Sequence, residues 1–203
     1  MELKYVIMDE GLRFDNLEYL CPELPAKRRE KIARYRFDTD KLRSLIAGLL
    51  IKRETGGAEI VYGEHEKPYL ADGVMFFSVS HSGDIVAIAV DDYEVGCDVE
   101  AIPSEDRLKI ADRFYHKRER EYVSASDDNL RAFCRIWTRK EAYLKMTGEG
   151  ISNDLTSFDV TGEPLSEKLY TLDIEGYCIS VCSQKPINGS GIYFSETEIK
   201  DLI

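Results

Sequence analysis

Apolar residues near the start of the chain recur at the spacing of an α-helix. From Asp38 onward, apolar residues lie on one face of a predicted helix, which we expect to be buried and to end at Gly56–Gly57. Before it, we expect a short strand over Leu3–Met8 and a helix over Pro25–Arg36 with a proline in its first turn. The apolar positions of the buried face are Leu42, Leu45, Ile46, Leu49 and Leu50.

The pattern then changes to β-branched runs, which are typical of strands. Short polar segments of turn composition, His81–Asp84 and Asp91–Glu94, separate these runs. Such short separations favour neighbouring antiparallel strands, so we expect a small meander. The three predicted strands are Val74–Val79, Ile85–Val90 and Val95–Val99.

Helical and then strand-like patterns return in the second half of the chain. The predicted helices are Glu105–Arg113, His116–Ser124 and Asp127–Met146. The predicted strands are Ser157–Val160, Leu169–Ile174, Tyr177–Val181 and Ile192–Phe194. The order helix, helix, sheet thus occurs twice. We therefore predict an α+β fold of two similar α/β halves, residues 1–102 and 103–203, with helices packed on small, mostly antiparallel sheets.

Composition narrows the class of protein. The 203 residues are 43% hydrophobic and 32% charged, as in ordinary globular proteins. The N-terminus lacks the basic segment of a secretory signal, and no apolar run reaches the roughly 18 residues of a membrane helix. We therefore expect a cytoplasmic protein that does not contact a membrane. Five cysteines without a CxxC pair favour reduced thiols over disulfides or a zinc site.

The net charge of −11 argues against a nucleic-acid-binding protein, because phosphate contacts need an excess of Lys and Arg. One local cluster has the opposite sign. It consists of Lys27, Arg28, Arg29, Lys31, Arg34 and Arg36. A solvated helix face is the simplest interpretation of such a cluster, and a site for an anionic ligand is the alternative.

Two acids follow each other at strand spacing in Val95–Glu100. The period of two places Asp98 and Glu100 on one face with their Cα atoms roughly 6.5–7 Å apart. If that face is buried, the two carboxylates repel unless a divalent cation or a basic side chain neutralises them. A solvated strand end is the alternative interpretation of an isolated pair.

Two further segments carry polar side chains in suggestive places. Glu141 and Lys145 lie four residues apart and share a helix face, where such a pair often only supports the helix. The segment Phe77–Gly83 runs from a strand into a hydroxyl-rich turn that could donate hydrogen bonds to a phosphate. An ordinary turn explains that segment equally well when it is taken alone.

Taken together, the order and spacing of these segments are specific. They resemble the motifs of the surfactin-synthetase-type 4'-phosphopantetheinyl transferases. The segments that carry the resemblance are Ser78–Gly83, Gly96–Glu100 and Trp137–Ala142, followed by Lys145 and Gly148. The resemblance also includes Phe114–Tyr115, Glu119, Lys67–Pro68–Tyr69 and the basic helix near Arg28 and Lys31. It implies a monomer of two pseudo-symmetric halves that binds coenzyme A in the cleft between them.

The resemblance also implies a set of site residues. The family's metal ligands match Asp98, Glu100 and Glu141, which would hold Mg²⁺, with Mn²⁺ as a substitute. Glu141 would also act as the base, Lys145 would stabilise charge on the pyrophosphate, and Glu119 would orient a neighbour such as Lys145. The residues that match the family's contacts to coenzyme A are Arg28, Lys31, Arg43, Ser44, Lys67, Pro68, Ser80, His81 and Lys145.

The implied reaction transfers the 4'-phosphopantetheine arm to a serine of an apo acyl or peptidyl carrier protein and releases 3',5'-ADP. Two alternatives stay open: a magnesium-dependent nucleotide pyrophosphohydrolase and a non-catalytic module that binds carrier proteins. Carrier proteins are usually acidic, so we expect a local basic patch to meet them. The helix with Lys117, Arg118 and Arg120 could provide that patch.

Overall fold

The computed structural model describes residues 1–63, 67–103, 107–150, 154–187 and 191–202. The strands are β1 (Glu2–Ile7), β2 (Ile60–Tyr62), β3 (Pro68–Leu70), β4 (Phe76–Ser82), β5 (Ile85–Asp91), β6 (Val95–Ala101), β7 (Leu169–Ile174), β8 (Tyr177–Ser183) and β9 (Tyr193–Glu196). The α-helices are α1 (Ala26–Arg34), α2 (Asp38–Glu54), α3 (Leu108–Phe114), α4 (Lys117–Ser124) and α5 (Asn129–Thr147). Short 3₁₀ helices cover η1 (Phe14–Asn16), η2 (Glu18–Glu23), η4 (Leu155–Ser157), η5 (Ser166–Lys168) and η6 (Ile199–Leu202).

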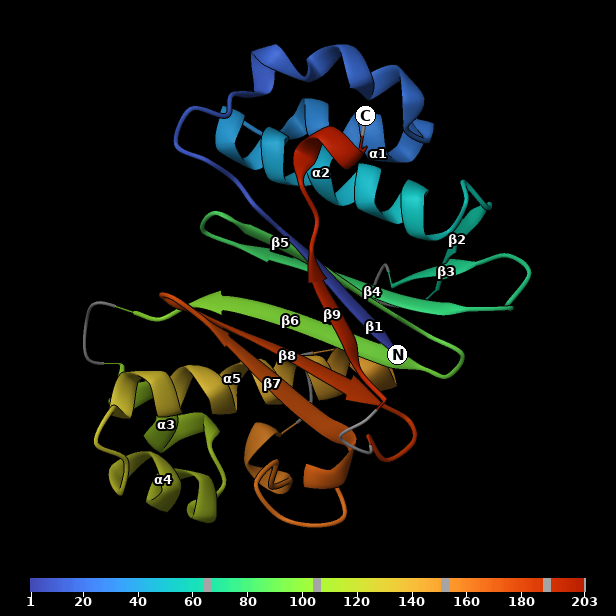
Figure 1. The fold of residues 1–203 in the computed structure, drawn as a ribbon. Helices are drawn as coiled ribbons and strands as arrows, with labels where there is room; N and C mark the ends of the chain where they lie inside the picture. The colour runs from blue at the N-terminus through green and yellow to red at the C-terminus, as the bar shows by residue number, and fades with distance from the viewer. Residues whose placement is uncertain (64–66, 104–106, 151–153, 188–190, 203) are drawn as a thin grey trace.

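Two sheets face each other in the middle of the molecule, and helices cover their outer faces (Figure 1). One sheet has the order β4-β5-β1-β9 and the other has the order β6-β8-β7, while β2 and β3 form a separate ribbon. Helices α1 and α2 lie over the first sheet, and α5 lies against the second with α3 and α4 beyond it (Figure 1). The prediction of an α+β fold with small, mostly antiparallel sheets is confirmed.

Strand β5 shows how the layers pack. Its residues alternate between two cores, as the side chains of a strand must. Val86, Ile88 and Val90 join the core under α2. Ile85, Ala87 and Ala89 join the core between the sheets, together with Val95 and Val99 of β6 and Ile179 of β8. A strand buried on both faces reads as a continuous apolar run, which is why the sequence of β5 lacks polar alternation.

The predicted meander is wrong in its last strand. β4 and β5 form an antiparallel hairpin, but β6 pairs with β8, in a register that places Glu100 opposite Cys178. β6 therefore lies in the second sheet, across the central core from β5. A short turn between strands favours pairing but does not require it, and in the second sheet Val95, Cys97 and Val99 of β6 are fully buried.

Most other predicted elements are confirmed within a few residues, including α2, which ends at Glu54, and α5, whose C-cap Gly148 adopts a left-handed φ of 77°. The first residues of the predicted helix over 105–113 lie outside the described ranges. The predicted strand over Ser157–Val160 is wrong. Its backbone groups bond to side chains instead, since Val160 N donates to Glu119 and the Phe158 carbonyl accepts from Lys140.

The first and last strands of the chain are neighbours in one sheet. β9 pairs in parallel with β1, with Glu2 opposite Tyr193. The last strand thus joins the sheet of the first half, as β6 joins that of the second (Figure 1). The division into residues 1–102 and 103–203 stays a prediction. No helix in the described part of the chain has the length and apolar character required to span a bilayer.

Candidate functional site

A ladder of hydroxyl groups joins β4 to β6 where the two sheets meet. The serines of β4 alternate along the strand and face β6. Ser78 Oγ accepts from Cys97 N at 2.9 Å, and Ser80 Oγ donates to Asp98 Oδ1 at 2.9 Å. Ser82 Oγ donates to Glu100 Oε2 at 2.8 Å. The two sheets share no backbone ladder here, so these side chains fix where the acids of β6 lie.

Lys145 completes this junction from α5. Its Nζ lies 2.6 Å from Asp98 Oδ1 and donates to Ser80 Oγ at 2.9 Å. Gly96 allows α5 to approach β6 closely, because a Cβ at this position would collide with the Ala142 carbonyl and lie 2.5 Å from Met146 N. The site therefore depends on contact between a strand and a helix that are far apart in the sequence.

Burial changes the charge balance of the acids. Desolvation raises the pKa of Asp98, whereas Lys145 and Ser80 oppose this rise. Burial also raises the pKa of Glu100, and the nearby Asp98 adds to the effect. Burial, followed by the charges of Asp98 and Glu100, raises the pKa of Glu141 to about 7. Burial would lower the pKa of Lys145, but Asp98 outweighs it and raises that pKa, so the amine stays charged.

The three predicted acids are close enough for their charges to interact, since Asp98 adds to the rise in the pKa of Glu100, and both add to the rise in the pKa of Glu141. In addition, Asp98 Oδ2 is buried and has no hydrogen-bond partner. Within the described residues, no group of three or more His, Cys, Asp or Glu side chains is arranged so that it could hold a metal ion. Carboxylates are nevertheless the donors that a hard cation prefers, and such a cation also takes substrate oxygens and water, so the three acids are candidate ligands.

A basic cavity of about 620 Å³ opens beside this junction. Such a volume is typical of small-molecule sites. The predicted contacts Arg28, Lys31, Pro68, Ser80, His81 and Lys145 all line it. Desolvation, followed by the charges of Lys31, Arg43 and Lys145, lowers the pKa of His81. The concentration of positive charge makes the cavity suitable for an anion.

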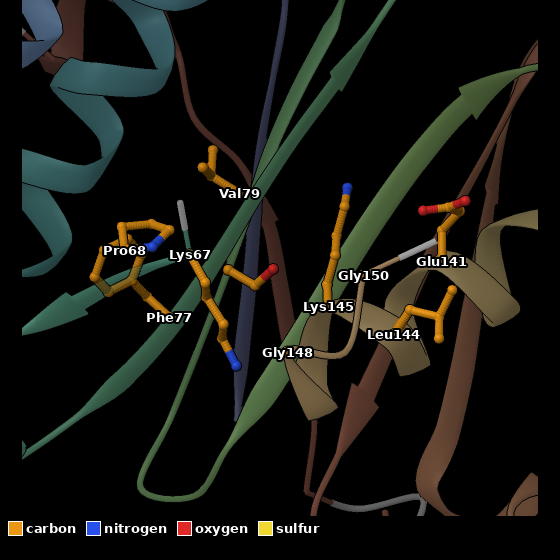
Figure 2. Close-up of a pocket in the computed structure, with 10 residues that line it drawn as sticks. Lys67, Pro68, Phe77, Val79, Glu141, Leu144, Lys145, Gly148 and Gly150 are labelled. Atoms are coloured by element: carbon orange, nitrogen blue, oxygen red, sulfur yellow. The ribbon is translucent and has the colours of Figure 1, made fainter. Parts of the chain in front are cut away.

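A second cavity of about 270 Å³ shares Pro68, Val79 and Lys145 with the first, so the two adjoin. Glu141 and Lys145 project from the same stretch of α5 on one side of it, and Pro68 and Phe77 lie across from them (Figure 2). The predicted common face of Glu141 and Lys145 is thereby found in the folded chain. Because Lys145 borders both cavities, a ligand in the basic cavity lies next to the acids.

Three predicted contacts lie less directly at the cavities. Lys67 lines the smaller one, but its Nζ donates to Glu94 Oε2 and to the Met146 carbonyl, both at 2.8 Å. Arg43 Nε donates to the Gly83 carbonyl at 2.6 Å, and its charge acts on His81. Ser44 is 1% exposed and is not among the residues that line either cavity.

The neighbour that Glu119 contacts is Lys140, and not Lys145 as the resemblance suggested. Glu119 is fully buried and pairs with Lys140 at 2.9 Å, and Lys140 is only 1% exposed. Glu119 also accepts from His116 N, which caps α4, while Lys140 Nζ donates to the Leu155 carbonyl. This satisfied ion pair joins α4, α5 and the segment after α5, outside the residues that line either cavity.

Sequence reasoning also missed the roles of Ser78 and Ser82. The turn was predicted over His81–Asp84, whereas β4 continues through Ser82 and the turn consists of Gly83 and Asp84. The signal was present, since serines at every second position of a strand share one face. Nothing local indicated that this face meets β6.

Comparison with known proteins identifies the family of this chain. A model of the 4'-phosphopantetheinyl transferase superfamily matches residues 94–190. The chain is 34% identical over 204 residues to the 4'-phosphopantetheinyl transferase psf-1 of Bacillus pumilus, covering 88% of this chain and 87% of that protein. The chain belongs to the 4'-phosphopantetheinyl transferase superfamily. The resemblance stated from the motifs, and the expectation that the chain is an enzyme, are confirmed.

Other relatives match over different lengths. A 4'-phosphopantetheinyl transferase of Bacillus subtilis is 31% identical over 171 residues, which cover 79% of this chain and 76% of that protein. The transferase AcpT of Salmonella typhimurium is 41% identical over 108 residues, which cover 51% of this chain and 56% of that protein. The solved holo-[acyl-carrier-protein] synthase of Thermotoga maritima is 16% identical with a TM-score of 0.36, covering 44% of this chain and 61% of that one.

Proposed function

We propose that this chain transfers the 4'-phosphopantetheine arm of coenzyme A to a serine of an apo acyl or peptidyl carrier protein and releases 3',5'-ADP. One observation carries the proposal: Lys145 lies between a basic cavity and a buried acid cluster, in contact with Asp98. A pyrophosphate that extends from the basic cavity would lie between this amine and the acids. That is the arrangement required to cleave a pyrophosphate linkage.

Asp98, Glu100 and Glu141 would hold Mg²⁺, for which Mn²⁺ could substitute. The unpartnered Oδ2 of Asp98 and the mutual pKa shifts of the acids support this assignment. When bound, the ion would neutralise charge on the pyrophosphate and hold its oxygens in place. The ion would also remove the repulsion among the three carboxylates. Because it would contact both the carboxylates and the substrate phosphates, each would favour binding of the other.

The remaining roles belong to the chain's own side chains. Arg28, Lys31 and His81 would bind the nucleotide phosphates in the basic cavity, which Pro68 also lines and which Lys67 borders. Arg43 would add positive charge at that end through its effect on His81. Lys145 would stabilise the charge that grows on the leaving phosphate. Ser80 holds this amine in place through its hydrogen bond.

Glu141 would accept the proton of the carrier serine. Serine is a weak nucleophile at neutral pH, and a base is most effective when its pKa is near the working pH. Without a cation, burial and the neighbouring acids raise the pKa of Glu141 to about 7. A cation held by the acids would favour the carboxylate form, so that Glu141 is deprotonated and able to accept a proton. The serine oxygen would attack the β-phosphorus as its proton moves to the carboxylate, and the bond to the leaving 3',5'-ADP oxygen would break.

We further infer that the enzyme works as a cytoplasmic monomer. Residues 1–102 contribute the basic cavity and two of the acids, and residues 103–203 contribute Glu141 and Lys145, so one chain supplies every group named above. Both Ser80 and Lys145 contact Asp98 within the same chain, which supports this view. A second subunit is not needed to build the site.

The decisive experiment incubates the chain with coenzyme A, Mg²⁺ and a panel of apo carrier proteins, and measures carrier mass. The expected result is a gain equal to one phosphopantetheine arm. Glu141→Ala should abolish it, whereas Glu121→Ala, which changes an exposed acid on α4, should not. Cleavage of coenzyme A without carrier modification would indicate a pyrophosphohydrolase, and neither reaction would indicate a binding module; both results contradict the proposal.

A further inference from the structure

Lys67 donates to two acceptors that belong to different parts of the fold. The residue comes directly before β3, and its own carbonyl accepts from Gly63 N at 3.0 Å. From this anchored backbone its Nζ donates to Glu94 Oε2 and to the carbonyl oxygen of Met146, each at 2.8 Å. The side chain of Lys67 is only 12% exposed. The β2–β3 ribbon therefore contributes a largely buried cation that binds both groups at once.

The Met146 carbonyl belongs to the last turn of α5. The last four carbonyl groups of a helix have no partner within the helix, and the partial negative charge at that end favours a cation. Gly148 N donates to the Leu144 carbonyl at 2.8 Å, and Lys67 donates to that of Met146. Lys67 thus caps the end of the helix that carries Lys145.

Glu94 connects the same amine to β6. It comes directly before this strand, and its backbone carbonyl accepts from Gln184 N at 2.9 Å, just after β8. Two residues further on, Gly96 allows the close approach of α5, and two residues beyond that, Asp98 pairs with an amine of the helix. Alternate residues of an extended chain share one face. The helix is therefore fixed along β6 at three successive positions, the first of them through Lys67.

This use of the amine differs from the contact to coenzyme A that the resemblance implies for Lys67. Lys67 and Lys145 both line the smaller cavity. Figure 2 shows, however, that the two amines point in opposite directions. To bind a phosphate, the Lys67 amine would have to break its bonds to Glu94 and to the Met146 carbonyl. Its aliphatic stem can line the cavity without such a change.

We propose that Lys67 is a positioning residue, which holds the end of α5 against β6 so that Glu141 and Lys145 keep the placement required for transfer. Without its amine, Glu94 and the Met146 carbonyl lose their shared partner, and the last turn of α5 opens more often. A misplacement of catalytic groups by about 1 Å can lower a rate by about a hundredfold. The catalytic consequence rests on the proposed function, whereas the cap on α5 does not.

The cap is tested by amide hydrogen exchange, which needs no enzymatic activity. Lys67→Met nearly keeps the length of the side chain and removes its charge, so residues 143–148 should exchange several-fold faster than in the wild type. Lys200→Met changes a lysine that is 73% exposed and should leave that segment unchanged. If Lys67→Met does not fold, Glu94→Gln weakens the hold on the amine and should give a smaller acceleration. Unchanged exchange in the folded variant would overturn the proposal.

A second experiment separates positioning from binding. Lys67→Met should lower the kcat of carrier modification about tenfold or more, and should leave the Kd of coenzyme A, measured by calorimetry, within about twofold. Lys67→Arg keeps a cation and should restore most of kcat. A coenzyme A contact predicts the reverse, a raised Kd with kcat retained, and that result would overturn the proposal. If the wild type modifies no carrier, the proposed function fails, while hydrogen exchange still decides the cap.

Discussion

Lys145 Nζ lies 2.6 Å from Asp98 Oδ1, and the two partners of this ion pair are unequally buried. The side chain of Lys145 is 34% exposed, whereas that of Asp98 is 6% exposed. Water can therefore solvate the amine if its partner is removed, but it cannot solvate the carboxylate to the same extent. The pair joins α5 to β6, so its energetics also determine how firmly the two sides of the site are held together.

This asymmetry predicts unequal effects of removing either partner. Lys145→Ala leaves the buried carboxylate of Asp98 without its charged partner, so it should lower the free energy of unfolding by on the order of 3 kcal/mol. Asp98→Ala leaves an amine that water can reach, so its loss should be clearly smaller. Urea unfolding of both variants without metal measures the difference. If both variants lose the same free energy of unfolding, the burial of Asp98 does not determine the effect of removing its partner.

Gly96 should tolerate no side chain. In Gly96→Ala, the new methyl group would collide with the Ala142 carbonyl, and backbone cannot move aside as a flexible side chain can. We expect a loss of about 3 kcal/mol or more, because overpacking a rigid contact exceeds the usual cost. Gly11→Ala is the control, since nothing lies within 4 Å of its Cβ position. Denaturant midpoints of the two variants should therefore differ widely.

The buried pair of Glu119 and Lys140 should behave as one unit. Removing either partner leaves the other charge without compensation, so Glu119→Ala and Lys140→Ala should each cost about 3–5 kcal/mol. The double variant should cost much less than the sum of the two. A double-mutant cycle by chemical denaturation measures this coupling. Additive losses would show that the two side chains stabilise the fold independently.

His81 should make stability depend on pH below neutrality. Its pKa in the folded chain lies below the usual 6.5, because of desolvation and the charges of Lys31, Arg43 and Lys145. As the pH falls below 6.5, the unfolded chain therefore binds more protons at this position than the folded chain does. The free energy of unfolding should fall as the pH drops through the folded pKa.

The variant His81→Gln isolates this contribution. The difference in unfolding free energy between the wild type and the variant should change between about pH 7.5 and about pH 5.5. Inorganic pyrophosphate should reduce the dependence, since an anion in the basic cavity favours protonated His81. If the difference in unfolding free energy between the wild type and His81→Gln stays constant across this pH range, Lys31, Arg43 and Lys145 do not disfavour protonation of His81.

The basic side chains of α4 should matter for the carrier rather than for coenzyme A. Lys117 and Arg118 are 78% and 73% exposed, so they can meet an acidic partner. The double change Lys117→Glu and Arg118→Glu should raise the KM for the carrier several-fold and leave coenzyme A binding unchanged. Lys52→Glu with Lys200→Glu makes the same charge change elsewhere and serves as the control. Equal carrier kinetics in both double variants would refute the docking role.

Elements with local signals could be predicted from the sequence alone. The spacing of Leu42, Leu45 and Leu49 fixed α2, and the apolar run of β5 indicated a strand. The interval of four residues between Glu141 and Lys145 was enough to place both on one helix face. The order of the motifs was enough to indicate the superfamily. These inferences need only the periods of a helix and a strand, which each segment carries within itself.

Which of these elements contact one another depends on the packing of the whole chain. β6 pairs with β8 and not with β5 as the predicted meander required. In this arrangement Asp98 contacts Ser80 and Lys145, which are 18 and 47 positions away in the sequence. Glu119 forms its ion pair with Lys140 rather than with Lys145. Local periodicity cannot encode such choices, because several registers satisfy the same pattern of apolar positions. The packing of whole layers selects one of them, and it leaves Asp98 buried with a charged partner at the edge of the basic cavity.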